Sequence, residues 1–218
     1  MQNVFGKYEK VKRFFQTLLV SWLALYATCA YSASKTVLVL GDSLSAEYGI
    51  ARGAGWVALL EKRLRSEKIN AVIVNASISG ETTSGGKARL PALLGQHHPD
   101  IVIIELGGND GLRGLPIAVT EANLRIMIHE SKQSKAKVLL VGMQIPPNYG
   151  REYAERFAGM YQKLAQETKT TLAPFLLEGI ADSPRLLQAD RIHPLANAQP
   201  LMLDNIWPRL APLLGATR

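Results

Sequence analysis

Short apolar runs rich in Val, Ile and Leu recur along the chain, separated by longer stretches with helical periodicity. Runs such as IVIIEL are apolar on both faces, which is typical of strands in a parallel sheet that helices cover on both sides. The alternation therefore predicts an α/β fold, a three-layer α/β/α sandwich with a parallel five-stranded sheet. The predicted strands span residues 36–40, 71–75, 100–106, 137–143 and, with a weaker pattern, 170–173.

Helical patterns fill the intervals between these strands. They predict helices around residues 56–64, 88–94, 122–131, 149–168 and within 198–214. Since proline lacks the N–H that a helix interior needs, we expect an interruption at Pro91 and a kink or break near Pro208. There is no internal repeat and no low-complexity linker, so residues 34–218 are expected to form one domain.

The N-terminus has the order of a secretory signal peptide: a basic flank, the apolar stretch FFQTLLVSWLALYA, and then small residues. This stretch is shorter than the roughly 20 apolar residues that span a bilayer. We expect residues 1–33 to be removed at a site between 27 and 34, leaving no stable membrane span in a periplasmic or secreted protein. An uncleaved anchor is the alternative.

Composition excludes several functions. Cys29 is the only cysteine, so a chain cut after it has neither a disulfide of its own nor a thiol nucleophile. The net charge is +7, but residues 1–33 contribute four basic groups and one acid, which leaves +4 for the rest. The remaining basic residues lie at helical spacing without interleaved aromatic residues, so we expect no nucleic-acid partner. Nothing in the sequence specifies an oligomeric state.

Each of the first four predicted strands is followed by a loop with polar or glycine-rich residues. The carboxyl ends of parallel strands meet at one edge of a sheet, so these loops are expected to converge. The loops carry GDSLS after the first strand, SISGETT after the second, GGND after the third and QIPPNYG after the fourth, and DRIHP precedes the last helix.

These loops hold the groups that a serine hydrolase requires. Ser43 is the candidate nucleophile, His193 the candidate base, and Asp190 can hold the second ring nitrogen of that histidine. Gly80 leaves room for a backbone N–H to approach a substrate, and Asn109 offers a neutral amide donor. Each residue also has a structural explanation, because Ser43 and Asp190 are common helix caps and glycines are common in turns.

Other catalytic or ligand-binding motifs are weak or missing. His97 and His98 stand before Pro99 and Asp100, at the opposite end of the predicted sheet, and no cluster of partners supports a metal site there. There is no GxSxG nucleophile elbow and no phosphate-binding P-loop. We therefore expect neither a metal nor a cofactor.

Together, the blocks GDSLS, SISGETT, GGND and DRIHP resemble those of the GDSL or SGNH hydrolases, and they cover nearly the whole chain after residue 33. The stretches VLGDSLSAEYGI, NASISGETTSGG, ELGGNDGLRGLP and MQIPPNYG resemble the bacterial arylesterase and multifunctional thioesterase/lysophospholipase group. The resemblance implies a flavodoxin-like fold and a catalytic triad of Ser43, Asp190 and His193. It also implies an oxyanion hole formed by the N–H groups of Ser43 and Gly80 and the side chain of Asn109.

The substrate implied by this resemblance is a small-molecule or lipid ester, a thioester or a lysophospholipid. Apolar residues of two loops are expected to form a wall for an acyl chain, and a cation beside them could meet an anionic group; the predicted substrate-binding residues are Leu112, Arg113, Leu115, Ile145, Pro146 and Tyr149. A carbohydrate esterase, or a binding module for lipids or glycans without turnover, is the alternative.

One residue departs from the family pattern. Similar enzymes often carry glycine before Ile-His-Pro, whereas this chain has Arg191. Arginine does not readily adopt the backbone conformations that glycine allows, and it places a cation close to the predicted base. The conformation of this loop and the preference for a headgroup are therefore open.

Overall fold

The protein is described from a computed structural model, which covers residues 34–216. These residues contain one five-stranded sheet in the order β2-β1-β3-β4-β5, and every pair of neighbouring strands is parallel. The strands are β1 (Lys35–Gly41), β2 (Ala71–Asn75), β3 (Ile101–Glu105), β4 (Lys137–Val141) and β5 (Thr171–Ala173). The predicted fold class is confirmed, and the five predicted strands match within two residues at each end.

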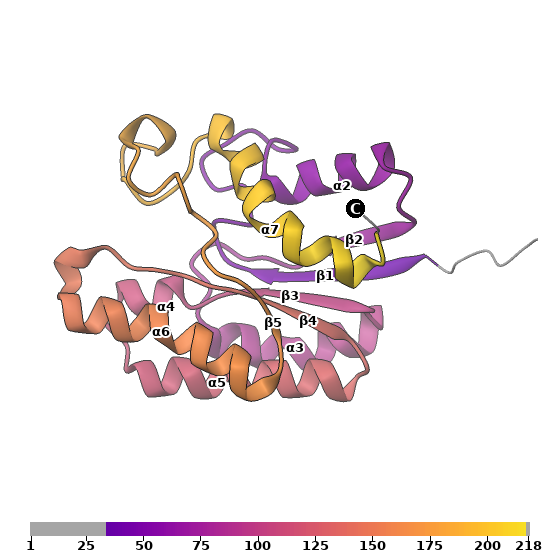
Figure 1. The fold of residues 1–218 in the computed structure, drawn as a ribbon, viewed down its shortest axis with the longest axis horizontal. Coiled ribbons are helices and arrows are strands. Elements are labelled where there is room, and N and C mark those ends of the chain that lie inside the picture. Colours follow the sequence, from indigo (N-terminus) through magenta and orange to yellow (C-terminus); the bar gives the residue numbers. More distant parts are fainter. Residues whose placement is uncertain (1–33, 217–218) are drawn as a thin grey trace, which may run out of the picture. The chain divides into compact units, whose positions relative to one another are not determined.

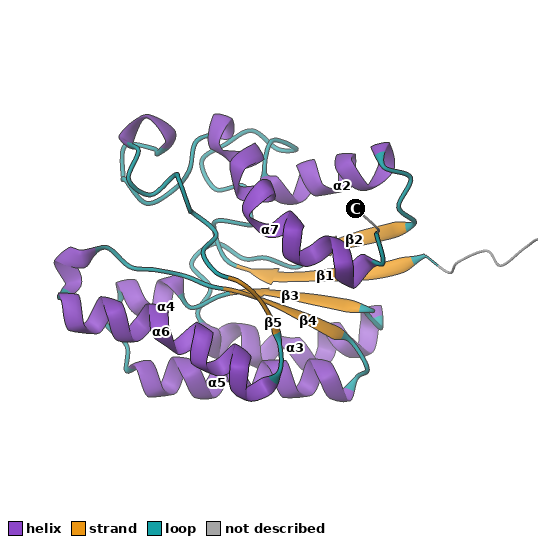
Figure 2. Cartoon of the chain, in the orientation of Figure 1, coloured by secondary structure: helices purple, strands orange, loops and turns teal. Residues whose placement is uncertain are grey.

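Helices cover both faces of this sheet, as Figures 1 and 2 show. On one face, α2 packs against α7; on the other, α5 contacts both α3 and α6. The helices are α2 (Trp56–Ser66), α3 (Thr83–His97), the short α4 (Gly108–Leu112), α5 (Ile117–Gln133), α6 (Arg151–Thr168) and α7 (Gln199–Leu214). The strand order and the layers are those of a flavodoxin-like three-layer sandwich.

The expected interruption at Pro91 is wrong, since α3 starts at Thr83 and continues through that residue. Likewise, α7 is a single helix that includes Pro208 and Pro212, so it is not broken. All three prolines are exposed. Because each proline lies on the solvent side, water can satisfy the carbonyl that loses its helical donor, and the remaining face still packs on the sheet.

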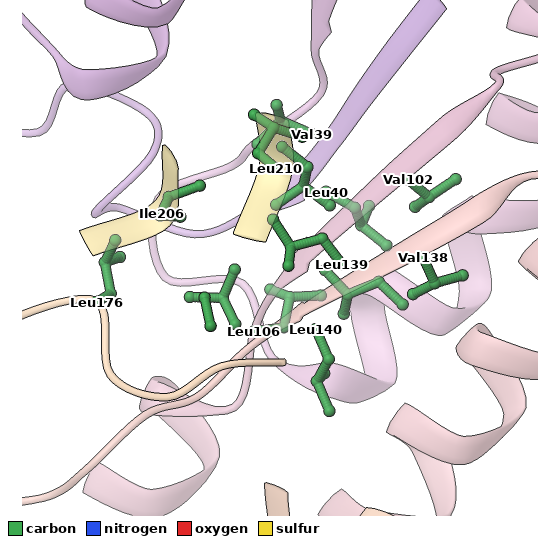
Figure 3. Packing of buried hydrophobic residues seen from close by; sticks show 14 of the residues in the cluster. Val39, Leu40, Val102, Leu106, Val138, Leu139, Leu140, Leu176, Ile206 and Leu210 are labelled. Atoms are coloured by element: carbon green, nitrogen blue, oxygen red, sulfur yellow. The ribbon is translucent and has the colours of Figure 1, made fainter. Parts of the chain in front are cut away.

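The core lies between the sheet and its helices. All five residues of β3 are buried, and the central positions of β1 are fully buried. Figure 3 shows side chains of the central strands, among them Val39, Val102 and Leu139, together with Ile206 and Leu210 of α7. Buried leucine or isoleucine side chains each contribute roughly 1.5–3 kcal/mol. This packing fixes the strand ends from which the loops of the site leave.

The predicted signal peptide, residues 1–33, lies outside the described residues. Among residues 34–216, no helix is long and apolar enough to cross a membrane.

Candidate active site

The loops that leave the carboxyl ends of the strands gather to the left of the sheet in Figure 2. Residues of these loops line a cavity. Its volume is about 380 Å³. Ser43, Asn109 and His193 all line it, although they are far apart in the sequence and lie after β1, after β3 and before α7. The structure thus brings together residues from three of the sequence blocks.

Ser43 lies in a tight turn directly after β1. The carbonyl of Asp42 accepts hydrogen bonds from the N–H groups of Ser45 and Ala46, at 3.2 and 3.0 Å. The Asp42 carboxylate accepts a further bond from the Leu44 N–H at 3.0 Å. Asp42, and not Ser43, is therefore the capping side chain of this turn, and the Ser43 hydroxyl is free to bond elsewhere.

The Ser43 hydroxyl bonds to His193, and His193 bonds to Asp190. Ser43 Oγ lies 2.9 Å from His193 Nε2, and His193 Nδ1 lies 2.7 Å from Asp190 Oδ2. An ionised carboxylate only accepts hydrogen bonds, so Nδ1 carries the proton and Nε2 of the neutral ring accepts from Ser43. This arrangement can draw the proton from a serine hydroxyl.

Asp190 is held in its ionised form by its own loop. Partial burial acts against ionisation, but the backbone N–H of His193, that of Ile192 and the His193 ring together lower the pKa of Asp190 to about 2. The two backbone bonds measure 3.0 and 2.9 Å. Asp190 therefore stays charged at any pH near neutrality and keeps the Nδ1 proton in place.

Two residues that the sequence interpretation missed support His193. The ring of Tyr48 lies against the imidazole, with centroids 4.4 Å apart. The side-chain amide of Gln188 donates to the carbonyls of Tyr48 and Pro194, at 2.9 and 3.2 Å, and the Gln188 N–H donates to the His193 carbonyl at 2.7 Å. Gln188 thereby ties the loop of the serine to the loop of the histidine. In the sequence, the position of Tyr48 five residues after Ser43 was the indication that its ring could lie at the site.

The predicted oxyanion donors lie around the same cavity. Gly80 has a φ of +79°, which favours glycine, and its carbonyl accepts from Arg113 at 3.0 Å. Within the described residues, the N–H groups of Ser43 and Gly80 donate to no backbone carbonyl. The Asn109 amide nitrogen donates to Asp42 Oδ2 and to the Glu81 carbonyl, both at 3.0 Å. An incoming oxyanion would have to share one of these amide hydrogens in a three-centre bond.

A second carboxylate lies beneath the nucleophile turn. Glu105, at the end of β3, is fully buried, and its Oε2 accepts from the Asp42 N–H at 3.2 Å and from Ser45 Oγ at 2.6 Å. A Cβ at position 41 would approach Glu105 Oε2 to 2.6 Å, so glycine is required there. Burial raises the pKa of Asp42 to about 6, and burial together with Asp42 raises the pKa of Glu105 well above its ordinary value.

The predicted substrate-binding residues divide into two groups. Leu112, Ile145 and Pro146 line the cavity, whereas Arg113, Leu115 and Tyr149 do not. Much of the remaining lining comes from the segment after β5, which the sequence interpretation did not consider: Phe175, Leu177, Ala181, Asp182 and Leu187. That segment follows the carboxyl end of a parallel strand, so the rule that located the other loops applies to it equally.

The loop that carries Arg191 has a defined backbone conformation in the structure. Its φ is 59°, in the left-handed region, and its N–H donates to the Gln188 carbonyl at 2.9 Å. The loop thus takes the conformation for which glycine is best suited, at a cost of roughly 1–2 kcal/mol for a larger residue. Arg191 itself also lines the cavity, two residues before His193.

Comparisons with known proteins identify relatives of this chain. Residues 39–199 match the GDSL-like lipase/acylhydrolase family. The chain belongs to this family. It is 51% identical over 197 residues to esterase TesA of Pseudomonas aeruginosa, covering 90% of this chain and 98% of that protein. It is 46% identical to thioesterase 1/protease 1/lysophospholipase L1 of Escherichia coli, covering 84% and 87% of the two chains.

A solved structure is similar to this chain over most of its length. The crystal structure of TesA superposes with a TM-score of 0.81 at 52% identity, over 82% of this chain and 99% of that one. The resemblance to the GDSL hydrolases is confirmed. This member of the family is an ester-hydrolysing enzyme, and a module that only binds lipids or glycans is set aside. Among residues 34–216, no three His, Cys, Asp or Glu side chains form a group that could hold a metal ion.

Proposed function

We propose that this enzyme is an exported serine esterase, in which Ser43 attacks the substrate carbonyl and forms an acyl-enzyme. The observation that carries the proposal is the unbroken chain of contacts from Ser43 Oγ through His193 to Asp190, with distances of 2.9 and 2.7 Å. His193 Nε2 takes the hydroxyl proton as the Ser43 oxygen bonds to carbon, and Asp190 stabilises the imidazolium that forms.

The developing oxyanion is bound by the N–H groups of Ser43 and Gly80 and by the Asn109 amide. The imidazolium then returns its proton to the leaving alcohol or thiol, which departs and leaves the acyl group on Ser43. Water enters, gives its proton to His193 and attacks the ester, and the acid leaves as Ser43 recovers its proton. No metal or cofactor takes part in these steps.

The proposed substrates are aryl esters, short- and medium-chain acyl esters, acyl thioesters and lysophospholipids. Two observations support this choice. The names of the relatives from P. aeruginosa and E. coli include esterase, thioesterase and lysophospholipase. The cavity is lined mainly by apolar side chains, among them Leu112, Ile145 and Leu177, which suit an acyl chain.

The decisive experiment is hydrolysis of a chromogenic acyl ester by the wild-type protein and by Ser43→Ala. The proposal predicts turnover by the wild type and loss of turnover in the variant, with both proteins folded. Equal rates would refute Ser43 as the nucleophile. A panel of esters tests the substrate class, since a strict preference for acetylated sugars would favour a carbohydrate esterase instead.

Export is proposed from the N-terminal sequence alone, where a basic flank, an apolar stretch and small residues follow one another. Expression of the full chain in a bacterium, followed by fractionation and N-terminal sequencing, tests it. A mature protein that starts between residues 28 and 35 in the periplasm or the medium is expected. A full-length protein retained in the membrane would indicate an uncleaved anchor.

A further inference from the structure

Asp42 is a buried carboxylate that the proposed mechanism leaves without a role. Only 2% of its surface is exposed, yet it lines the same cavity as Ser43 and Asn109. Its two oxygens accept from different groups: Oδ1 from the Leu44 N–H in the nucleophile turn, and Oδ2 from the Asn109 amide. This one side chain therefore contacts one proposed oxyanion donor, Asn109, and the turn that carries another, the Ser43 N–H.

We propose that Asp42 is the positioning residue of the oxyanion hole, orienting the Asn109 amide and fixing the turn that carries the Ser43 N–H. This inference rests on the proposed function, because it assigns Asn109 and the Ser43 N–H to the oxyanion.

The contact with Asn109 decides which end of its amide serves as donor. The nitrogen and the oxygen of an asparagine amide have nearly the same shape, so only the hydrogen-bond partners select between two orientations. Here the partners are the Asp42 carboxylate and the Glu81 carbonyl, both acceptors. If the amide turned over, its oxygen would face two other oxygens, and a carbonyl instead of an N–H would meet the oxyanion.

Glu105 explains how a charge can remain at Asp42 in a buried place. Asp42 accepts two hydrogen bonds that favour its charge, from the Leu44 N–H and from the Asn109 amide. Glu105 Oε1, by contrast, has no hydrogen-bond partner among the described residues. Glu105 Oε2 also accepts two hydrogen bonds, but burial and the neighbouring Asp42 raise the pKa of Glu105 well above its ordinary value, whereas the pKa of Asp42 rises only to about 6. Glu105 is thus the neutral partner and Asp42 the charged one.

Asp42→Asn is the direct test, because asparagine has the same shape but only one acceptor. Whichever way its amide turns, it loses either the Leu44 N–H or the Asn109 amide. We expect kcat for a chromogenic short-chain ester to fall about 10- to 100-fold, as for a misplaced catalytic group, with KM changed less than about threefold. Asp42→Ser provides a second variant, since a serine hydroxyl can still cap the turn but is too short to reach Asn109.

A double-mutant cycle separates positioning from a merely structural role. In an Asn109→Ala background, Asp42→Asn should lower kcat by no more than about threefold, because the group it orients is already absent. Asp100→Asn is the matched control just before the opposite end of β3, where the carboxylate accepts from the Thr36 N–H. Glu105→Gln should lower kcat much less than Asp42→Asn, because it replaces a neutral group by another.

The outcomes distinguish this inference from the proposed function. If Ser43→Ala keeps wild-type turnover, the proposed function fails. If Ser43→Ala is inactive but Asp42→Asn turns over normally, or loses equally in both backgrounds, only the role of Asp42 fails. Failure of both Asp42 variants to fold, measured by circular dichroism and thermal unfolding, would also overturn it, because Asp42 would then determine the fold.

Discussion

Two aspartates of the site, Asp190 and Asp42, have pKa values that are shifted in opposite directions. Asp190 lies in a loop, with 38% of its side chain exposed, and hydrogen bonds from its own loop lower its pKa to about 2. Asp42 lies at the end of a central strand, where burial raises its pKa to about 6. The same residue type is thus stabilised as an anion on one side of the serine and destabilised on the other.

The difference reflects the element that carries each residue. The loop around Asp190 can wrap its backbone N–H groups around a carboxylate, as in a helix N-cap. A strand end packed on Glu105 has no such freedom, and its carboxylate depends on two donors and a neutral neighbour. The exposed side of the site, the loop of Asp190 and His193, therefore holds the proton relay at little cost in folding stability. The buried side, Asp42 with Asn109, has a fixed geometry that lowers the stability of the fold.

The largest effect is expected from removing the base on the exposed side. His193→Ala should lower kcat by about 10⁴-fold or more, since the members of such a triad act as a unit. Steady-state hydrolysis of a chromogenic ester measures it. His129→Ala, on an exposed position of α5, is the matched control and should keep wild-type turnover. A loss below about 100-fold would mean that another group takes the serine proton.

Asp190→Asn tests the proton relay with almost no change in shape. The new amide can donate to His193 Nδ1 and so place the ring proton on Nε2, where it cannot accept from Ser43. We expect kcat to fall on the order of 10³-fold, with Asp204→Asn on the surface as control. A loss below tenfold would show that the charge on the exposed side matters less than the arrangement of its loop.

Asn109→Ala tests the buried side. Loss of one oxyanion donor typically lowers the rate about 100- to 1000-fold. The variant should remain folded, because the side chain is only partly buried and the surrounding core is apolar. Kinetics and circular dichroism check both statements, with the exposed Asn197→Ala as control. Turnover near that of the wild type would exclude Asn109 from the oxyanion hole.

The stability of the protein should report the raised pKa of Asp42. A group with a raised folded pKa contributes stability below its unfolded pKa of about 4, and this contribution is lost as pH rises through about 6. Glu105, His193, Asp110 and Tyr161 are the titratable groups that interact with it. Relative to the wild type, the Tm of Asp42→Asn should therefore increase between pH 4 and pH 8.

Each kcal/mol corresponds to a change in Tm of about 2–4 °C in a domain of this size. A rise in the pKa of Asp42 from about 4 to about 6 corresponds to about 3 kcal/mol, so the expected relative shift is about 6–12 °C, measured by thermal unfolding at several pH values. Asp204→Asn, whose carboxylate is exposed, should show no such trend. A constant difference between Asp42→Asn and the wild type across this range would contradict an ionised, buried Asp42.

Arg191→Gly is expected to have the smallest effect. Glycine removes the strain of a positive φ but increases the entropy of the unfolded chain, so the stability should change by no more than about 1 kcal/mol. Turnover of a neutral short-chain ester should stay within about threefold. Thermal unfolding and kinetics with neutral and anionic esters measure both. A large loss with the neutral ester would show that the arginine side chain shapes the site itself.

The sequence was sufficient for the parts of the molecule that follow from local pattern and from the direction of the strands. Runs such as IVIIEL predicted buried strands, because a strand of a parallel sheet that helices cover on both sides is apolar on both faces. The convergence of Ser43 and Asn109 followed from the direction of the parallel strands, whereas His193, which precedes the last helix, was assigned from the DRIHP block. Helix ends were less predictable, since whether a proline interrupts a helix depends on which side of it faces water, and Pro91 faces solvent.

The buried part of the site could not be derived from pattern. Glu105 is the single carboxylate in an apolar run, which was a signal, but its partner is set by how β1 and β3 pair. Gln188 and Tyr48 meet across 140 residues of sequence, so only the folded chain shows their contact. The cavity lining after β5 was missed because that strand has just three residues and a weak pattern.

The central claim, that Ser43 is the nucleophile, is tested most directly by covalent labelling. A fluorophosphonate probe reacts with an activated serine, and peptide mass spectrometry locates the adduct. We predict one equivalent of label on Ser43, no label in Ser43→Ala, and much slower labelling in His193→Ala. Labelling at another residue, or equal labelling of Ser43→Ala and the wild type, would contradict the account.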